Sequence, residues 1–241
     1  MSEVALLFGL SEIPSLGQIV DQINFRKLAS DFAAGAAGIA ANAGIIIIYI
    51  LFLLAEQRTF DRKIRTLFPD TDRQKEVQEL LHKIQTQIQT YVWIKTLMSL
   101  LTGGLSYLIL ILVGLDYALF WAFVIFLLNY IPTIGSLLGI TLPSLLALVQ
   151  FNTMVPFGVI VVTLGAAQFA IGSVLEPRLM GRSLNLSPLV VIVTLVVWSS
   201  IWGIAGALLS VPITVIAMIT FSHFHRTRPI AIILSGDGNI E

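Results

Sequence analysis

The sequence contains no cysteine. This absence excludes a disulfide framework, a thiolate nucleophile and a metal site with cysteine ligands, and it leaves the redox compartment undetermined. Histidine is also scarce, because only His82, His223 and His225 occur, all in polar flanks. Catalysis needs a nucleophile with a base, paired carboxylates or a metal cluster, and the sequence shows none of these arrangements. We therefore predict that the protein is not an enzyme and uses no cofactor.

Charged residues are scarce as well, at 12% of the chain against about a quarter in soluble proteins. The formal net charge is zero, so charge gives no reason to expect a nucleic-acid partner. In contrast, 56% of the residues are hydrophobic and the mean hydropathy is +0.91. Helices are the structure that lets long apolar runs satisfy their own backbone in lipid. The composition therefore predicts an all-α, polytopic membrane protein whose partner is the lipid bilayer.

The order of polar and apolar segments predicts the domain organisation. The parts are an N-terminal interfacial segment (1–32), a transmembrane helix (33–55), a cytoplasmic amphipathic helical region (56–95), a transmembrane transport core (96–222) and a cytoplasmic tail (223–241). In the amphipathic region, a stripe with 4-3-4-3 spacing predicts a helix with one buried face. Its members are Val77, Leu81, Ile84, Ile88, Tyr91 and Lys95. The stripe packs either on the protein itself or the headgroups, or on a second subunit.

The uncharged stretch 118–151 is too long for one membrane span and short for two, since a span takes about 20 residues. Pro132 removes a backbone donor and restricts the residue before it, so the helix should end or kink there. A break at membrane depth survives only where protein surrounds it or water fills a cavity. We therefore predict a discontinuous or re-entrant helix pair whose turn belongs to the substrate pathway. The predicted pathway residues in this turn are Asn129, Tyr130, Pro132, Thr133, Gly135 and Ser136. Alternatively, the polar side chains only satisfy the freed backbone groups.

A second uncharged stretch, residues 189–221, has the same design. Small and polar residues between 199 and 210 interrupt it, and Pro212 is expected to begin another apolar half. Paired interrupted segments in the two parts of a chain point to a transport site. The further residues that we assign to the pathway are Gln168, Gly203, Gly206 and Pro212. Gln168 alternatively joins helices by hydrogen bonds.

Charges near the membrane core are predicted to be functional, because they are costly there. Glu176, Arg178 and Arg182 lie around Pro177 in a compact loop. They are candidates for coupling or gating, with a local ion pair or an anchor at the helix end as the alternative. If each interrupted stretch runs there and back, all basic clusters fall on one side, which the positive-inside rule identifies as the cytoplasm.

Three ordered motifs resemble those of one family. Residues 129–136 read NYIPTIGS and resemble the N-[FY]-I-P-x-[IV]-G motif of the autoinducer-2 exporter family, the PerM-type permeases. Residues 176–188, EPRLMGRSLNLSP, resemble its x-P-[RK]-[LIV]-M-G-[RK]-x-[LVI]-x-[LI]-x-P signature. Residues 202–212, WGIAGALLSVP, are similar to its G-[IVL]-x-G-x-[LIM]-[LI]-[AS]-[VI]-P segment. The resemblance covers roughly residues 33–221.

The resemblance implies a permease of the bacterial inner membrane that exports a small polar molecule, such as the quorum-sensing signal autoinducer-2. It also implies assembly as a homo-oligomer. The alternative that the family suggests is a sodium or lithium antiporter that exchanges the cation for protons. Family members usually carry additional N-terminal spans before the matching region. A third expectation is therefore a truncated, non-transporting membrane scaffold, which the paired helix breaks oppose.

Overall fold

The computed structural model describes residues 47–56, 59, 62–63, 66–67, 70–151, 153–180 and 184–239. The chain divides into two compact units, Met1–Gln74 and Lys75–Glu241, and each is described by itself. The predicted interfacial segment (1–32) and most of the predicted first span (33–55) lie outside the described residues.

In the first unit, the apolar helix Ile47–Glu56 is the described end of the predicted first span. The Glu56 carboxylate forms an ion pair with Lys63. Farther along, the Asp70 carboxylate accepts a hydrogen bond from the backbone N–H of Asp72 at 3.0 Å. This bond caps the start of α4 (Thr71–Val113), because it satisfies one of the free N–H groups of the first helical turn.

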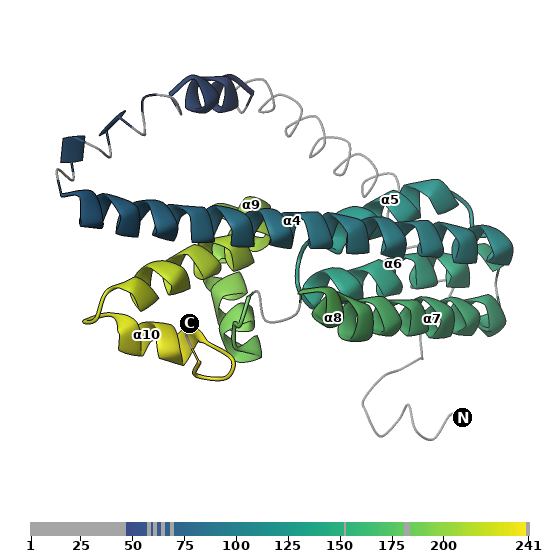
Figure 1. The fold of residues 1–241 in the computed structure, drawn as a ribbon. Coiled ribbons are helices and arrows are strands. Elements are labelled where there is room, and N and C mark those ends of the chain that lie inside the picture. Colours follow the sequence, from purple (N-terminus) through teal and green to yellow (C-terminus); the bar gives the residue numbers. More distant parts are fainter. Residues whose placement is uncertain are drawn as a thin grey trace. The chain divides into compact units, whose positions relative to one another are not determined.

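The second unit is helical (Figure 1). After α4 come α5 (Ala118–Leu128), α6 (Ile134–Phe151), α7 (Met154–Gln168), the π-helix η1 (Phe169–Leu175), α8 (Glu176–Met180), α9 (Pro188–His223) and α10 (Arg228–Leu234). An isolated bridge joins Leu186 and Ser235, and the described residues contain no strand.

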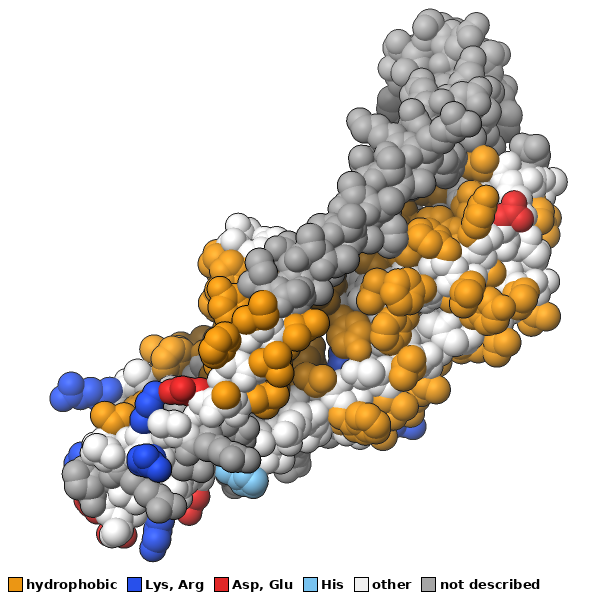
Figure 2. Space-filling model, turned by 90° about the horizontal axis from the view of Figure 1, so that it is seen from above, with side chains coloured by type: hydrophobic (Ala, Val, Ile, Leu, Met, Phe, Trp, Pro, Cys, Tyr) orange, Lys and Arg blue, Asp and Glu red, His pale blue; other side chains and the backbone are white. Residues whose placement is uncertain are grey.

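Four helices are long and apolar enough to cross a membrane: Thr71–Val113, Ile134–Phe151, Met154–Met180 and Pro188–His223. Many large apolar side chains lie exposed on the surface of the described helices (Figure 2), as expected where lipid is the solvent. The prediction of an all-α, polytopic membrane protein is confirmed.

Within the second unit, α4 provides a long surface on which other helices pack (Figure 1). Toward its C-terminal end, Leu110 joins a buried cluster with residues of α5 and α6 such as Trp121 and Ala147. Nearer its start, Tyr91 packs in a second cluster with Val211 and neighbouring residues of α9. The helix continues without a break across the predicted boundary between the amphipathic region (56–95) and the transport core.

The predicted stripe on α4 packs partly on the protein itself. Ile84 and Tyr91 contact the α9 cluster. Leu81, in contrast, is 37% exposed. A contact with a second subunit through this stripe therefore remains a prediction that concerns its exposed positions.

The first predicted break lies between α5 and α6, in the turn of a tight helical hairpin. α5 ends at Leu128, and α6 begins at Ile134. Thr133 has a positive φ of 62°, which is uncommon for a residue with a side chain. Gly135 lies so close to the end of α5 that a Cβ there would overlap the Leu128 carbonyl oxygen. The hairpin therefore requires glycine at this position.

The second break lies inside α9, which is two helices joined at Gly203 (φ 60°, ψ −135°). Gly206 repeats the close approach of the first hairpin, because a Cβ there would overlap the Trp198 carbonyl oxygen. Pro212 lies inside the return arm and not at its start. The expectation that Pro212 begins the second apolar half is therefore wrong. The reversal depends on the left-handed backbone of Gly203, whereas the fixed φ of proline is compatible with a helix.

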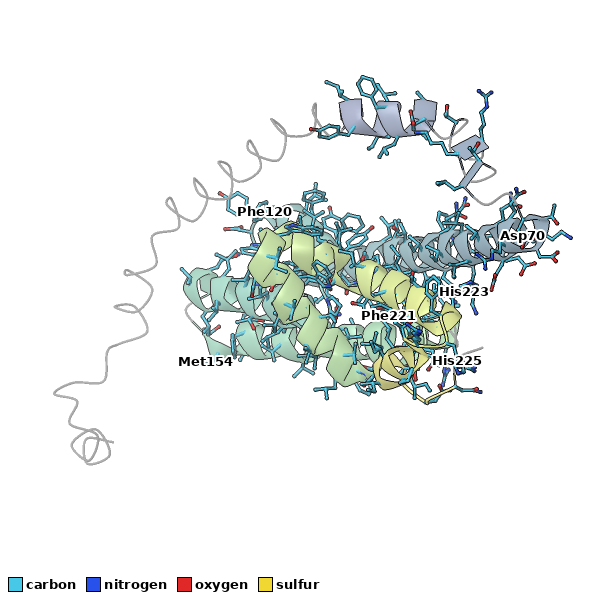
Figure 3. The ribbon with its side chains drawn as sticks, turned by 90° about the vertical axis from the view of Figure 1, so that its left-hand side faces the viewer. Asp70, Phe120, Met154, Phe221, His223 and His225 are labelled. Carbon is cyan, nitrogen blue, oxygen red and sulfur yellow. The ribbon has the colours of Figure 1, made fainter. Side chains whose placement is uncertain are left out.

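The ends of these helices separate into two groups in the second unit (Figure 3). Phe120 and Met154, near the starts of α5 and α7, lie at one end. Phe221, His223 and His225 lie at the opposite end, beside α10. That the α9–α10 end faces the cytoplasm stays a prediction.

Candidate functional site

A polar cavity of about 410 Å³ lies where the turn between α5 and α6 meets α4 and the helix from α7 to α8. Its lining is formed by Lys95, Asn129, Ile131, Pro132, Thr133, Ser136, Ile140, Gly165, Gln168, Phe169, Gly172, Ser173 and Glu176. The volume lies within the range of about 300–1,000 Å³ that is usual for small-molecule sites. The helix break thus lines a cavity, which is one of the two surroundings in which a break at membrane depth is tolerated.

One ion pair forms part of the cavity wall. The Lys95 ammonium on α4 donates a hydrogen bond to the Glu176 carboxylate on α8, with Nζ and Oε1 2.6 Å apart. The side chains are 7% and 15% exposed, respectively. Charges removed from water need a partner, because each carries a desolvation cost of several kcal/mol. The pair therefore holds α4 and α8 together at the cavity and leaves the wall without net charge.

A chain of hydrogen bonds between side chains connects three elements beside this pair. Asn129 is 5% exposed, and its Nδ2 donates to Ser99 Oγ on α4 at 3.1 Å. Gln168 Nε2 on α7 donates to Asn129 Oδ1 at 3.0 Å. The Asn129 side chain thus bonds side chains of both α4 and α7. Gln168 joins helices, as one of its predicted roles requires, and also lines the cavity.

Tyr130 anchors the same turn from outside the cavity lining. Its hydroxyl donates to Thr96 Oγ1 at 2.8 Å, and that hydroxyl in turn donates to the Val92 carbonyl at 2.7 Å. Its ring also packs edge-on against Phe126, with centroids 5.7 Å apart. Tyr130 therefore fixes the position of the turn against α4.

The polar residues after Pro132 satisfy part of the broken backbone. Ser136 Oγ donates to the Thr133 carbonyl oxygen at 3.0 Å. Pro132, Thr133 and Ser136 also line the cavity. Ser136 thus has the predicted structural role and also lies in the cavity lining. Gly135 does not line the cavity, because its place is against the end of α5.

The wall opposite the turn contains the π-helix η1. Phe169, Gly172 and Ser173 of η1 line the cavity, together with Gly165 and Gln168 of α7 and Glu176 of α8. Short π-helical segments are rare and frequently occur at functional sites. Here the segment lies between Gln168 and Glu176, so it sets how the amide and the carboxylate face the cavity.

The structure does not bring every predicted site residue to this cavity. Gly203, Gly206 and Pro212 lie in α9 and are absent from the lining. Arg178 is exposed on α8, and Arg182 lies outside the described residues. The predicted local pair of Glu176 with Arg178 is replaced by the pair with Lys95.

Lys95 was missed by the sequence-based prediction of site residues, although it ends the amphipathic stripe. Two signals in the sequence point to it. It is the last charged residue before the apolar run 96–115, and it lies four positions after the buried Tyr91, on the same helix face. A charged residue at such a position on a buried face needs a partner inside the protein.

The cavity lining is rich in groups that form hydrogen bonds. It offers amide and hydroxyl groups that both donate and accept, together with one balanced ion pair. In the part of the chain that the structure describes, no group of three or more His, Asp or Glu residues is placed to hold a metal ion. An uncharged or dipolar solute fits these groups best, since net charge would find no net counter-charge.

Comparison with known proteins agrees with the sequence motifs. A family model described as AI-2E family transporter matches residues 12–226. A protein of Borreliella burgdorferi named "Putative transport protein" is 30% identical over 223 residues, covering 90% of this chain and 61% of that protein. A Haemophilus influenzae protein of the same name is 34% identical over 208 residues, covering 85% and 58%.

The "AI-2 transport protein TqsA" of Escherichia coli is 28% identical over 223 residues, covering 92% of this chain and 64% of that protein. The chain therefore spans about three fifths of the length of the relatives that it matches.

Proposed function

We propose a transport function for this chain, because it belongs to the AI-2E transporter family. In this proposal, a small polar solute crosses the bacterial inner membrane by way of the cavity at the α5–α6 turn. The observation that carries the proposal is the cavity itself. Hydrogen-bonding side chains and a buried ion pair surround a helix break among helices that are long enough to span a membrane.

The favoured direction is export of a signal such as autoinducer-2. One relative is named as an AI-2 transport protein, and the cavity has the size and the mixture of donors and acceptors that a small hydroxylated molecule needs. Asn129 and Gln168 would contact the solute directly, and Thr133 and Ser136 would contact it from the break.

Glu176 is proposed to couple or gate transport, with Lys95 in place of Arg178 as its partner. The pair crosses from α4 to α8, so a change in either helix that separates the two charges also changes the cavity wall. For Arg178 and Arg182 we propose the alternative role of anchors at the cytoplasmic surface in place of coupling or gating, because basic residues follow the positive-inside rule.

A cation antiporter is the second candidate. It is favoured by one observation, the Glu176 carboxylate in the cavity wall. If Lys95 moved away, this carboxylate would be free to accept a proton or a sodium or lithium ion. The scaffold hypothesis does not account for a buried ion pair beside a polar cavity. We also propose a homo-oligomer, with exposed positions of the α4 stripe such as Leu81 as candidate contacts.

The test is flux into and out of proteoliposomes that contain the purified chain. Export of autoinducer-2 predicts that loaded vesicles lose the signal faster than protein-free vesicles. An antiporter instead predicts sodium- or lithium-driven movement of protons. If the protein is correctly inserted and the vesicles show neither loss of autoinducer-2 nor cation-driven proton movement, the transport proposal is contradicted. The hypothesis of a non-transporting scaffold would then be favoured.

A further inference from the structure

Helix α10 contains exposed isoleucines and adjoins exposed arginines, although it lies outside the predicted spans. We propose that α10 is a membrane-surface helix that binds anionic phospholipid headgroups through Arg226 and Arg228, with its isoleucines inserted at the acyl boundary. The inference does not depend on what the protein transports.

The helix is held at its N-terminal end by the return arm of α9. Thr227 Oγ1 donates to the Phe221 carbonyl oxygen at 2.9 Å. The backbone N–H of Arg228 donates to the Phe224 carbonyl oxygen at 3.0 Å. These bonds turn the chain sharply after α9, so that α10 begins next to the end of a candidate span.

The C-terminal end of α10 is held by the segment that precedes the first arm of α9. The backbone N–H of Ser187 donates to the Leu234 carbonyl oxygen at 3.0 Å, and that of Gly236 donates to the Asn185 carbonyl oxygen at 2.9 Å. Helix α10 is therefore held at one end by the end of α9 and at the other by the segment before α9, so it bridges the two ends of the α9 hairpin. Figure 3 shows this end of α9, with Phe221, His223 and His225 next to α10.

One face of α10 packs on the protein, and another face is apolar and exposed. Ala231 is fully buried. Ile230 and Ile232 are each 45% exposed, and Ile233 is 74% exposed. Ile230 and Ile233 are three residues apart and so share a face of the helix. A short helix with exposed apolar side chains beside a membrane span has the composition of a segment that lies in the lipid interface.

The charge of this region is complementary to an anionic surface. Arg226 and Arg228 are exposed, and residues 222–236 contain no Asp or Glu. Two carboxylates beside this region contact other side chains. Glu76 lies 3.3 Å from His223, and Asp237 accepts a hydrogen bond from Asn185 Nδ2 at 2.7 Å. Each basic residue near an anionic leaflet contributes about a fivefold increase in binding. The two arginines therefore remain available for phosphate.

The absence of cysteine allows a direct test, because a single introduced cysteine carries the only dye. We would attach an environment-sensitive fluorophore to Ile233→Cys and reconstitute the protein in phosphatidylcholine vesicles with and without phosphatidylglycerol. Lipids with a nitroxide near the headgroup report contact with the interface. The matched control is Asn239→Cys, an exposed position in the polar segment after α10.

We expect the lipid nitroxide to quench the Ile233→Cys dye several-fold more strongly than the Asn239→Cys dye. Phosphatidylglycerol should strengthen this quenching, and the double variant Arg226→Gln/Arg228→Gln should lose the increase. Added salt should weaken the increase in the unaltered protein as well, since exposed charges are screened. Equal quenching at the two positions would overturn the proposal. Strong quenching that does not change with phosphatidylglycerol, with salt or in the double arginine variant would contradict the recognition of anionic headgroups.

Discussion

Lys95 and Glu176 form an ion pair across the cavity wall, although 81 positions separate them in the sequence. The pair connects the middle of α4 with α8, the helix that follows the π-helical segment. Because both charges are largely buried, each depends on the other for its stability. The energetic consequence can be tested separately from transport.

Lys95→Met should destabilise the protein by about 3–5 kcal/mol, because it leaves the Glu176 carboxylate without its partner. Glu176→Gln should act in the same direction. The double variant Lys95→Met/Glu176→Gln removes both charges and should recover most of the loss. Thermal unfolding in detergent measures these differences. If the double variant is as unstable as the sum of the single variants, the two charges do not depend on each other.

Gly135→Ala and Gly206→Ala should each destabilise the protein, because the added Cβ overlaps a backbone carbonyl oxygen that cannot move aside. The expected cost is about 1–3 kcal/mol or more, as for other overpacked sites. Gly104→Ala and Gly158→Ala are the matched controls, since nothing lies within 4 Å of a Cβ at either position. The controls should be neutral or stabilising by up to about 1 kcal/mol. Tolerance of alanine at Gly135 or Gly206 would contradict the tight hairpins.

Both hairpin breaks could be predicted from the sequence, because proline and glycine act on their local backbone. Pro132 stands in the observed turn, and Gly203 stands at the observed reversal. Pro212 was assigned wrongly, since proline is also compatible with a helix and the sequence does not say which glycine adopts the left-handed conformation. The break positions are therefore predictable to within a few residues.

The content of the site was less predictable. Asn129, Pro132, Thr133, Ser136, Gln168 and Glu176 were predicted and line the cavity. Lys95 was not, because its role depends on contact with a residue 81 positions away. Sequence patterns show that Lys95 lies on the buried face of α4, but only the packing of α8 shows what that face meets. Gly206 was predicted for the pathway, but its place is within its hairpin.

Membrane topology gives a prediction that depends on neither cargo nor coupling. Cysteines introduced at Lys75 and Arg228 should be shielded from an impermeant thiol reagent outside intact cells, because basic segments face the cytoplasm. Thr153→Cys, beside Met154 at the opposite end of the second unit, should be labelled. Labelling of Arg228→Cys from outside would reverse the orientation.

The segment after α10 is held by Asn185, whose Nδ2 donates to Asp237 Oδ1 and to the Asn239 carbonyl oxygen, each at 2.7 Å. Asn185→Gly removes both bonds while tolerating the positive φ of 38° at this position. Hydrogen exchange of the Gly236 N–H should then accelerate by roughly tenfold to a hundredfold, since a bond to a charged group contributes about 1.5–3 kcal/mol. Asn239→Ala is the control, because it keeps the backbone carbonyl that Asn185 binds. Its Gly236 N–H should exchange at the rate seen in the unaltered protein. If the Gly236 N–H exchanges at the same rate in Asn185→Gly as in the unaltered protein, the Asn185 side chain does not hold the segment after α10.

The most direct test of the proposed cavity is flux per correctly inserted molecule in proteoliposomes. Asn129→Ala removes the amide that connects Ser99 with Gln168, and Pro132→Ala allows helix to continue through the break. Thr163→Val on α7 is the control, because its hydroxyl bonds its own helix and lies outside the cavity lining. We predict that flux per molecule falls in Asn129→Ala and Pro132→Ala and is retained in Thr163→Val. Unchanged flux per molecule in both cavity variants would contradict transport through this cavity.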